Sequence, residues 1–181
     1  MVTISGFLAP RKCESSVAST QQRFMRRGIT KILFLKTISA PTNIPTRAEL
    51  TGPGATDLSK QVSDIEGWSL ENSPIETPDL GNKFATSIPG EDKAASSSLT
   101  FYEDLGSEVV EALLAKDTAG YVCILRKGDI PQSKSLDIFP VRVGSRAPSY
   151  STGTEPAKYK VSFSISDLPT LDAPVPAAAA G

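Results

Sequence analysis

The residues that could do chemistry in this chain are few, and histidine is absent. Its absence excludes Ser–His–Asp and Cys–His catalysis and imidazole metal sites. Glu103 and Asp104 are adjacent and could act as an acid–base pair, although a solvated strand end explains them more simply. Asp64, Glu66 and Asp92 could hold Ca²⁺ through their oxygens, but an acidic surface explains them more simply. The sequence therefore predicts no catalytic, metal or cofactor site.

Cysteine, tryptophan and glycine give no stronger chemical signal. Cys13 and Cys123 make no disulfide framework, which suits a reducing cytoplasm. Cys123 lies in an apolar run with no basic neighbour to lower the pKa of its thiol, so we expect a small hydrophobe. Trp68 could be a platform for a ligand, but a lone Trp in a strand more often belongs to a core or an interface. Gly52 and Gly54 lack the pattern of a phosphate loop.

Length and charge narrow the class of protein. The 181 residues allow one domain with long loops or at most two small domains, and 14 Pro and 13 Gly predict many turns. Residues 1–27 carry five Lys or Arg against one acid, a charge of +4, whereas the remainder carries 14 against 19, a charge of −5. An acidic body argues against a nucleic-acid-binding protein. No apolar run approaches the ~20 residues that span a membrane.

The stretch Ser96–Lys127 is predicted to form the centre of the fold as a strand, a helix and a second strand. Ser98–Tyr102 alternates small polar and large apolar residues, which is typical of a half-buried strand. Ser107 is the expected N-cap of the helix. The apolar stripe of that helix consists of Val109, Val110, Leu113 and Leu114. Tyr121–Leu125 is apolar on both faces, so we expect it to be a central strand.

Four further strands are predicted from apolar or alternating runs. They cover residues 29–38, 62–70, 137–146 and 159–166. In the second of these, Asp64, Glu66 and Trp68 are expected on one face. Pro140 in the third predicts an edge position or a bulge. The resulting fold class is α+β and mainly β: an antiparallel β-sandwich or barrel with one packed α-helix.

The chain is expected to divide into an arm, a domain and a tail. Residues 1–26 form a basic arm, residues 27–167 the domain, and residues 168–181 a tail rich in Pro and Ala. Within the domain, residues 41–56 read as a loop. Residues 71–96 show no clear periodicity and contain five Pro or Gly, so they read as a long loop. Loops of this length are uncommon in compact domains unless they are functional.

Several short segments share their residues, order and spacing with one known family. They are Arg27–Ile32, Ile65–Trp68, Thr77–Phe84, Ile88–Glu91, Ser98–Tyr102, Thr118–Tyr121 and Asp137–Val143. In these segments the chain resembles the major tail tube proteins of long-tailed, siphovirus-type bacteriophages, and most closely those of actinobacterial phages. The resemblance covers about residues 27–167. The arm before Met25 departs from the family pattern.

The resemblance implies a structural virion protein rather than an enzyme, without a cofactor. Such subunits form hexameric rings that stack into a tail tube, assembled in the host cytoplasm, with a continuous β-barrel around a channel for genome ejection. Ring closure would pair the edge strands that a monomer exposes. The implied partners are further copies of the chain and the tape measure, tail terminator and distal tail proteins. DNA would pass without specific binding, and no membrane is involved.

Two sets of residues are expected to have roles in such a tube. In the strand 159–166 one face is apolar, and the polar face is expected to line the lumen, because small hydroxyls hold DNA weakly. That face consists of Lys160, Ser162, Ser164 and Ser166. If it faced outward, residues 62–70 would supply an acidic wall instead. The residues expected to reach a neighbouring subunit or ring are Thr77, Pro78, Asp79, Leu80, Gly81, Phe84, Ile88 and Pro89.

Two other functions fit the same residues. The first is the inner tube of a contractile injection device or a phage-like bacteriocin, which a neighbouring sheath gene would favour. The second is a soluble β-sandwich binding module, which would use its loops for recognition and would stay monomeric at high concentration. Electron microscopy of the concentrated protein would separate a tube from such a module.

Overall fold

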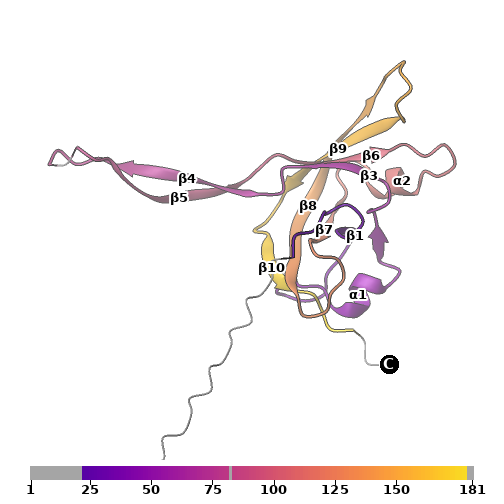
Figure 1. The fold of residues 1–181 in the computed structure, drawn as a ribbon, viewed down its shortest axis with the longest axis horizontal. Coiled ribbons are helices and arrows are strands. Elements are labelled where there is room, and N and C mark those ends of the chain that lie inside the picture. The colour runs from indigo at the N-terminus through magenta and orange to yellow at the C-terminus, as the bar shows by residue number, and fades with distance from the viewer. Residues whose placement is uncertain (1–21, 82, 179–181) are drawn as a thin grey trace, which may run out of the picture.

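A computed structural model describes residues 22–81 and 83–178 as one curled antiparallel sheet and a separate hairpin (Figure 1). The sheet contains β1 (Lys31–Leu35), β2 (Ala55–Asp57), β3 (Val62–Glu66), β6 (Ser97–Tyr102), β7 (Ala119–Leu125), β8 (Lys134–Ser149), β9 (Lys158–Ile165) and β10 (Thr170–Pro174). The strand order is β2–β1–β7–β8–β9–β6–β3, and β10 pairs with β8. Within the described residues the sheet is open, so the expected mainly-β antiparallel fold is confirmed without a closed barrel.

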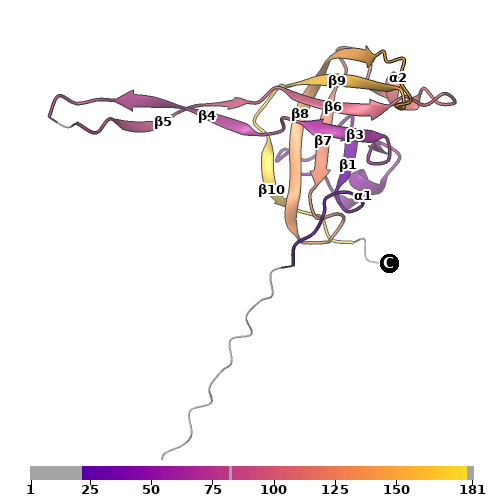
Figure 2. The same cartoon turned by 45° about the horizontal axis from the view of Figure 1, so that its top comes forward.

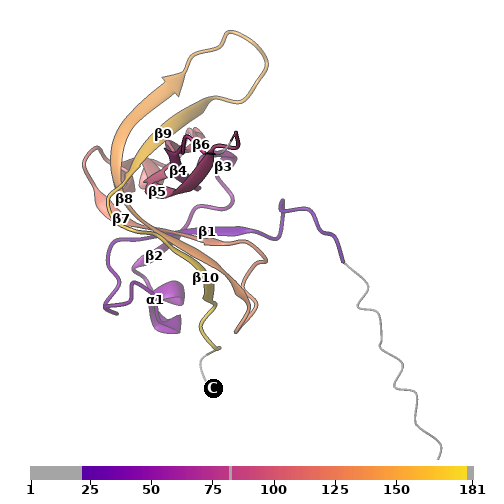
Figure 3. The ribbon, with the colours of Figure 1, turned by 90° about the vertical axis from the view of Figure 1, so that its left-hand side faces the viewer.

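The core consists of two clusters on opposite faces of β1, β7 and the first half of β8. Because the sheet curls, β3 and β6 lie opposite β1 (Figure 3), and the inner cluster fills the space between them. Successive residues of β1 point to opposite faces, so Ile32 and Phe34 enter the inner cluster while Leu33 and Leu35 enter the outer one. The outer cluster is completed by Leu50, Cys123, Leu125, Leu136, Ile138, Ala173 and Val175. Tyr121–Leu125 is thus covered on both sides, as its sequence predicted.

The helix predicted at the centre of the fold is only one turn long. This helix, α2 (Val109–Leu113), begins after Glu108 rather than Ser107, and no side chain caps it. Val109 is 66% exposed, whereas Val110 and Leu114 are buried in the inner cluster. Val110 and Leu114, together with the partly buried Leu113, therefore anchor this short segment against the inner cluster. The interpretation of α2 as a central helix was wrong, because five helical residues cannot cover a sheet.

A second helix, α1 (Arg47–Thr51), lies in the stretch that was expected to be a loop. Its N-terminus carries a capping box: Thr46 accepts from the Glu49 N–H, and the Glu49 carboxylate accepts from the Thr46 N–H at 2.7 Å. Arg47 forms a two-pronged ion pair with Asp129, which ties α1 to the turn between β7 and β8. Neither helix in the described part of the chain has the length or apolarity to cross a membrane.

Pro140 does not mark an edge strand, because β8 lies in the middle of the sheet. On one side β8 pairs with β7. On its other side β10 pairs up to Ile138 and β9 starts at Val141, so Pro140 falls in the gap between the two partners. Its carbonyl accepts from the Ser166 N–H at 3.0 Å, and its nitrogen points to the same junction. The missing N–H therefore interrupts no ladder.

Residues 71–96, expected to be a loop, form most of a hairpin: β4 (Leu70–Thr77) and β5 (Thr86–Ala94). We call β4, β5 and their connection the arm, as distinct from the N-terminal arm of residues 1–26. The arm projects from the curled sheet (Figures 1 and 2). The alternation of apolar and polar residues is missing because nearly every side chain of the arm is exposed. Gly90 is required for the pairing, since a Cβ there would lie 2.0 Å from the Ser73 carbonyl oxygen.

The tail predicted over residues 168–181 also needs correction. Thr170–Pro174 forms β10 on the free side of β8, and both Ala173 and Val175 are buried in the outer cluster. The three prolines of this stretch fit an edge strand, which has one side without ladder bonds. The tail is therefore part of the domain at least as far as Val175.

Candidate assembly surfaces

The last predicted strand has the two faces that its sequence indicates. In β9, Tyr159, Val161 and Phe163 are 4%, 0% and 5% exposed and belong to the inner cluster. Lys160 and Ser164 are exposed on the opposite face and Ser162 is half-buried. Ser166, the fourth residue of the set, follows β9 and is exposed.

This polar face continues across the neighbouring strands. Strand register places residues opposite one another on the same face of a sheet. The residues that share the face with β9 are Ser98 and Thr100 of β6, Asp64 and Glu66 of β3, and Arg142, Ser145 and Ala147 of β8. We call this surface, across β8, β9, β6 and β3, the polar face. Trp68, which was expected beside Asp64 and Glu66, is not part of it.

The charges on the polar face are largely paired. Lys160 forms an ion pair with Glu66 across β6, and the Ser98 hydroxyl donates to the same carboxylate at 3.2 Å. The hydrogen bond from Lys160 lowers the pKa of Glu66, so the carboxylate stays ionised. The charge of Lys160 is thus offset by a neighbouring acid. Within the described chain, Asp64 and Arg142 carry the remaining charges of this face without an ion pair.

The four strands of the polar face end in two open edges. β3 pairs with β6 alone, and within the described residues no strand pairs with the second side of β8 beyond Val143. The Ile65 N–H donates to the Asp64 side chain at 2.9 Å, so it points out of the sheet instead of toward β6. Such edges accept a further strand.

The arm carries the residues that were expected to reach a neighbour. Thr77 and Thr86 bond to each other through their hydroxyls at 3.0 Å and close the paired part of the hairpin. Pro78, Asp79, Leu80, Gly81 and Phe84 lie in the connection beyond them, and Leu80 and Phe84 are 110% and 73% exposed. Ile88, next to Pro89, lies opposite Ile75, and these two isoleucines are 52% and 55% exposed. The structure thus brings this set together along the outer part of the arm.

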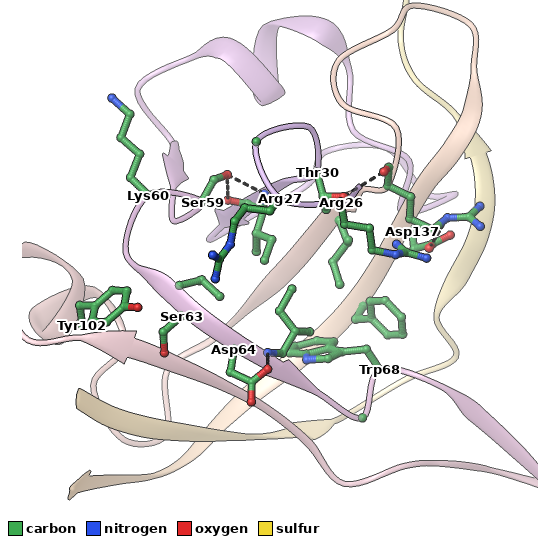
Figure 4. A pocket seen from close by; sticks show the side chains of 18 residues that line it. Arg26, Arg27, Thr30, Ser59, Lys60, Ser63, Asp64, Trp68, Tyr102 and Asp137 are labelled. Carbon is green, nitrogen blue, oxygen red and sulfur yellow. Dashed lines mark hydrogen bonds and ion pairs between the residues drawn. The ribbon is translucent and has the colours of Figure 1, made fainter. Parts of the chain in front are cut away.

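An open cleft of about 750 Å³ lies between the β1 side and the β3 side of the curled sheet (Figure 4). Trp68 lies at its base, where the indole contacts Phe139 and Phe163 with ring centroids 5.1 and 5.4 Å apart. The indole N–H donates to the Ser98 carbonyl at 3.1 Å. Trp68 reaches this position because Gly67 and Trp68 both have positive φ, at 76° and 63°. These angles end the alternation of β3 before Trp68, so the strand pattern in the sequence could not predict the side to which Trp68 points.

The other residues considered for chemistry lie apart from one another. The Asp104 carboxylate accepts from the Gly106 N–H at 2.9 Å in an exposed loop, with Glu103 beside it. Asp92 accepts from Asn72 at 2.6 Å on the arm, away from Asp64. Burial raises the pKa of the Cys123 thiol to about 12, which disfavours a thiolate. The described residues include no group of three metal-binding side chains.

The family model described as phage tail tube protein matches residues 17–178. The chain belongs to this family. It is a structural tail tube protein, and the family name agrees with the resemblance seen in the sequence. No curated protein matches the chain.

Solved structures share the fold of this tail tube protein at low identity. A chain from the structure of the sheath/tube terminator of PVC, an extracellular contractile injection system, is 11% identical over 83% of this chain and 98% of its own, with a TM-score of 0.56. A chain of the six-fold symmetrised anti-feeding prophage baseplate is 12% identical over 84% and 98%, with a TM-score of 0.53. A chain from the tail of an empty GTA particle with C6 symmetry is 10% identical over 78% and 94%, with a TM-score of 0.51.

Proposed function

We propose that this tail tube protein forms hexameric rings that stack into the non-contractile tube of a siphovirus-type phage of actinobacteria. The tube conducts DNA during ejection, and the subunit has no enzymatic activity. The observation that carries the proposal is the four-stranded polar face with an open edge at each side, β3 and the second half of β8.

Rotational symmetry makes these two edges compatible. The strands β8, β9, β6 and β3 alternate in direction, and rotation about a barrel axis leaves the direction of each strand unchanged. Strand β3 of one copy would therefore run antiparallel to β8 of the next. Antiparallel pairing satisfies the outward N–H and C=O groups of both edges. Two of the similar solved structures are themselves six-fold assemblies, and the proposal takes the same ring size.

The polar face is proposed to line the lumen through Lys160, Ser162, Ser164 and Ser166. The opposite side of β9, β6 and the first half of β8 is filled by the inner cluster, so along these strands the polar face is the side that is left to meet water or DNA. Each unpaired cation on such a wall would add affinity for phosphate through counterion release. The pairing of Lys160 with Glu66 limits that affinity and suits a channel through which DNA slides.

The remaining parts of the proposal concern boundaries and partners. We retain residues 27–167 as the tube domain, extend it through β10, and keep residues 1–26 as an N-terminal arm. The expected partners are further copies of the chain and the tape measure, tail terminator and distal tail proteins, with assembly in the host cytoplasm before the tail joins the virion.

Electron microscopy of the concentrated full chain tests the proposed tube. Hollow tubes built of six-fold rings are expected, and a strictly monomeric protein would contradict the proposal. Ile65→Pro removes an outward N–H from the β3 edge without removing a bond to β6, so it is expected to abolish rings. Ile65→Val keeps the N–H and is expected to assemble normally.

Timed DNA release from triggered particles tests the lumen assignment. Ser162→Arg with Ser164→Arg is expected to allow tube assembly and to slow or block ejection. Each subunit then places two guanidinium groups on the channel wall, where they bind DNA phosphates. Ala48→Arg with Thr51→Arg adds the same charge on exposed positions of α1 and is the matched control. Ejection at equal rates from the two variants would overturn the assignment.

A contractile injection device is the second candidate. Two of the similar structures come from contractile systems, the anti-feeding prophage and PVC, although their low identity supports the shared fold alone. A sheath gene beside this gene would select the contractile device, and its absence would favour the siphovirus tube.

A further inference from the structure

We propose that the cleft beside Trp68 is the receptor for the tip of the arm of a second copy of this chain. The contact would be head-to-tail, with Leu80 entering the apolar base and Asp79 meeting the basic rim. The inference deepens the proposed tube and rests on it, because repeating head-to-tail contacts need many copies.

The cleft has an apolar base and a basic rim. Ile32, Trp68 and Phe139 form the base, while Ile65 and Tyr102 on the opposite wall remain 41% and 39% exposed. The exposed side chains Arg26, Arg27 and Lys60 lie along the lining and form no ion pair within the described chain. Figure 4 shows Arg27, Ser59 and Lys60 on one wall and Ser63, Asp64 and Tyr102 on the other.

The charge balance of the cleft favours an acidic occupant. Arg126, also in the lining, is neutralised by Asp137 at 2.8 Å and by Asp172. The three unpaired cations then face a single unpaired acid, Asp64, which leaves the rim basic. The arm is the opposite: residues 70–94 carry five Asp or Glu against two Lys, a charge of −3.

The arm also supplies apolar side chains that can pack against the apolar base of the cleft. Leu80 is 110% exposed at the tip, and Ile75 and Ile88 form an exposed pair behind it. A two-stranded hairpin without a covering layer is at best marginally stable in water, so the arm needs a partner surface. At about 3.3 Å per residue, the nine-residue β5 spans about 30 Å, which is about the width of a domain of this size. The arm can therefore reach across an adjacent copy.

Two other occupants are disfavoured by the same features. The cleft cannot receive its own arm, because the arm starts at Leu70, just after Trp68 of the cleft, and continues the direction of β3 and β6 away from the sheet (Figure 2). The N-terminal residues 1–21 carry Arg11 and Lys12 against Glu14, a charge of +1, and the rim is already basic. The arm of a second copy is acidic and has an apolar tip, so it matches the basic rim and the apolar base of the cleft, and it is long enough to reach them.

Site-specific disulfide formation tests the contact. In a Cys13→Ser background, where Cys123 is buried, Leu80→Cys with Ser63→Cys is oxidised in the assembled full chain and examined on non-reducing gels. A ladder of linked copies is expected. The pair Leu80→Cys with Thr51→Cys, on α1 away from the cleft, is the control and is expected to remain unlinked. Equal linking in both pairs, or assembly without linking at Ser63, would overturn the proposal.

Charge reversal provides a second measurement. Lys60→Glu is expected to raise the protein concentration needed for assembly by about threefold to tenfold, and Asp79→Lys in the same chain is expected to restore it. An equal loss in the double variant would overturn the pairing of rim and tip. Tubes of normal appearance without tip–cleft links would refute only the receptor, whereas a chain with Leu80→Cys and Ser63→Cys that forms linked copies but no tubes would refute the proposed function.

Discussion

The curled sheet and the arm are both antiparallel β-structure, yet they are stabilised in different ways. In the sheet, the four consecutive β7 residues Val122–Leu125 are at most 7% exposed, whereas β4 and β5 contain no buried residue at all. Backbone hydrogen bonds contribute only about 1 kcal/mol each in water, so burial of apolar side chains decides stability. The comparison predicts that the sheet folds on its own, whereas the arm needs the contact with other copies that we propose.

The largest expected contrast is between a large core side chain and an exposed side chain of the arm. Phe101 is fully buried and stacks on Tyr159 at 5.4 Å, so Phe101→Ala should lower the free energy of unfolding by about 3–5 kcal/mol. Ile88→Ala on the arm should change it by less than about 0.5 kcal/mol. Denaturant unfolding of the monomeric chain measures both, and equal losses would show that the arm is part of the core.

A second contrast separates the two sides of α2. Leu114 is 1% exposed, so Leu114→Ala should cost about 2–5 kcal/mol, whereas Val109→Ala, at a 66% exposed position, should stay within about 0.5 kcal/mol. The same unfolding experiment applies. Comparable losses of unfolding free energy at the two positions would support the central helix that the sequence predicted and contradict the single turn of the structure.

Hydrogen exchange should sharpen the comparison in the arm itself. Amides of residues 71–94 are expected to exchange quickly in the free subunit and slowly in the assembled tube, because every described residue of this range except Gly90 is exposed. Amides of β7 are expected to exchange slowly in both states and provide the internal control. Equally fast exchange of the arm in both states would argue against docking of the arm.

The smallest expected effect is a pH dependence at α1, far from the arm. Hydrogen bonds from Thr46 and Ser39 lower the pKa of Glu49 from its ordinary value of 4.5 to about 2. Between these two values the unfolded chain binds a proton that the folded chain does not. The contribution of Glu49 is therefore complete above about pH 4.5 and is lost as the pH falls toward 2. Glu49→Gln should show a shallower fall in Tm over this range than the unmodified chain, and parallel curves would contradict the role of the cap.

Several parts of the fold could be predicted from sequence because the signal is local. The alternation in Tyr159–Ser166 records one buried and one solvated face, and the structure confirms both. The apolar run Tyr121–Leu125 likewise required cover on two sides. The capping box of Thr46 and Glu49 was also readable in the sequence but was missed, because the surrounding prolines and glycines suggested a loop.

What the sequence determined by itself was the strand pattern of the body, its acidic charge, and the order of segments that place it among tail tube proteins. Only the tertiary structure decided three features: the pairing of the arm, the seat of Pro140 between β9 and β10, and the turn that brings Trp68 to the cleft. Side-chain periodicity reports burial. It therefore cannot predict the exposed strands of the arm, which bury no side chain. Nor can it predict the position of Pro140 between two partner strands or the change of direction that positive φ produces at Trp68.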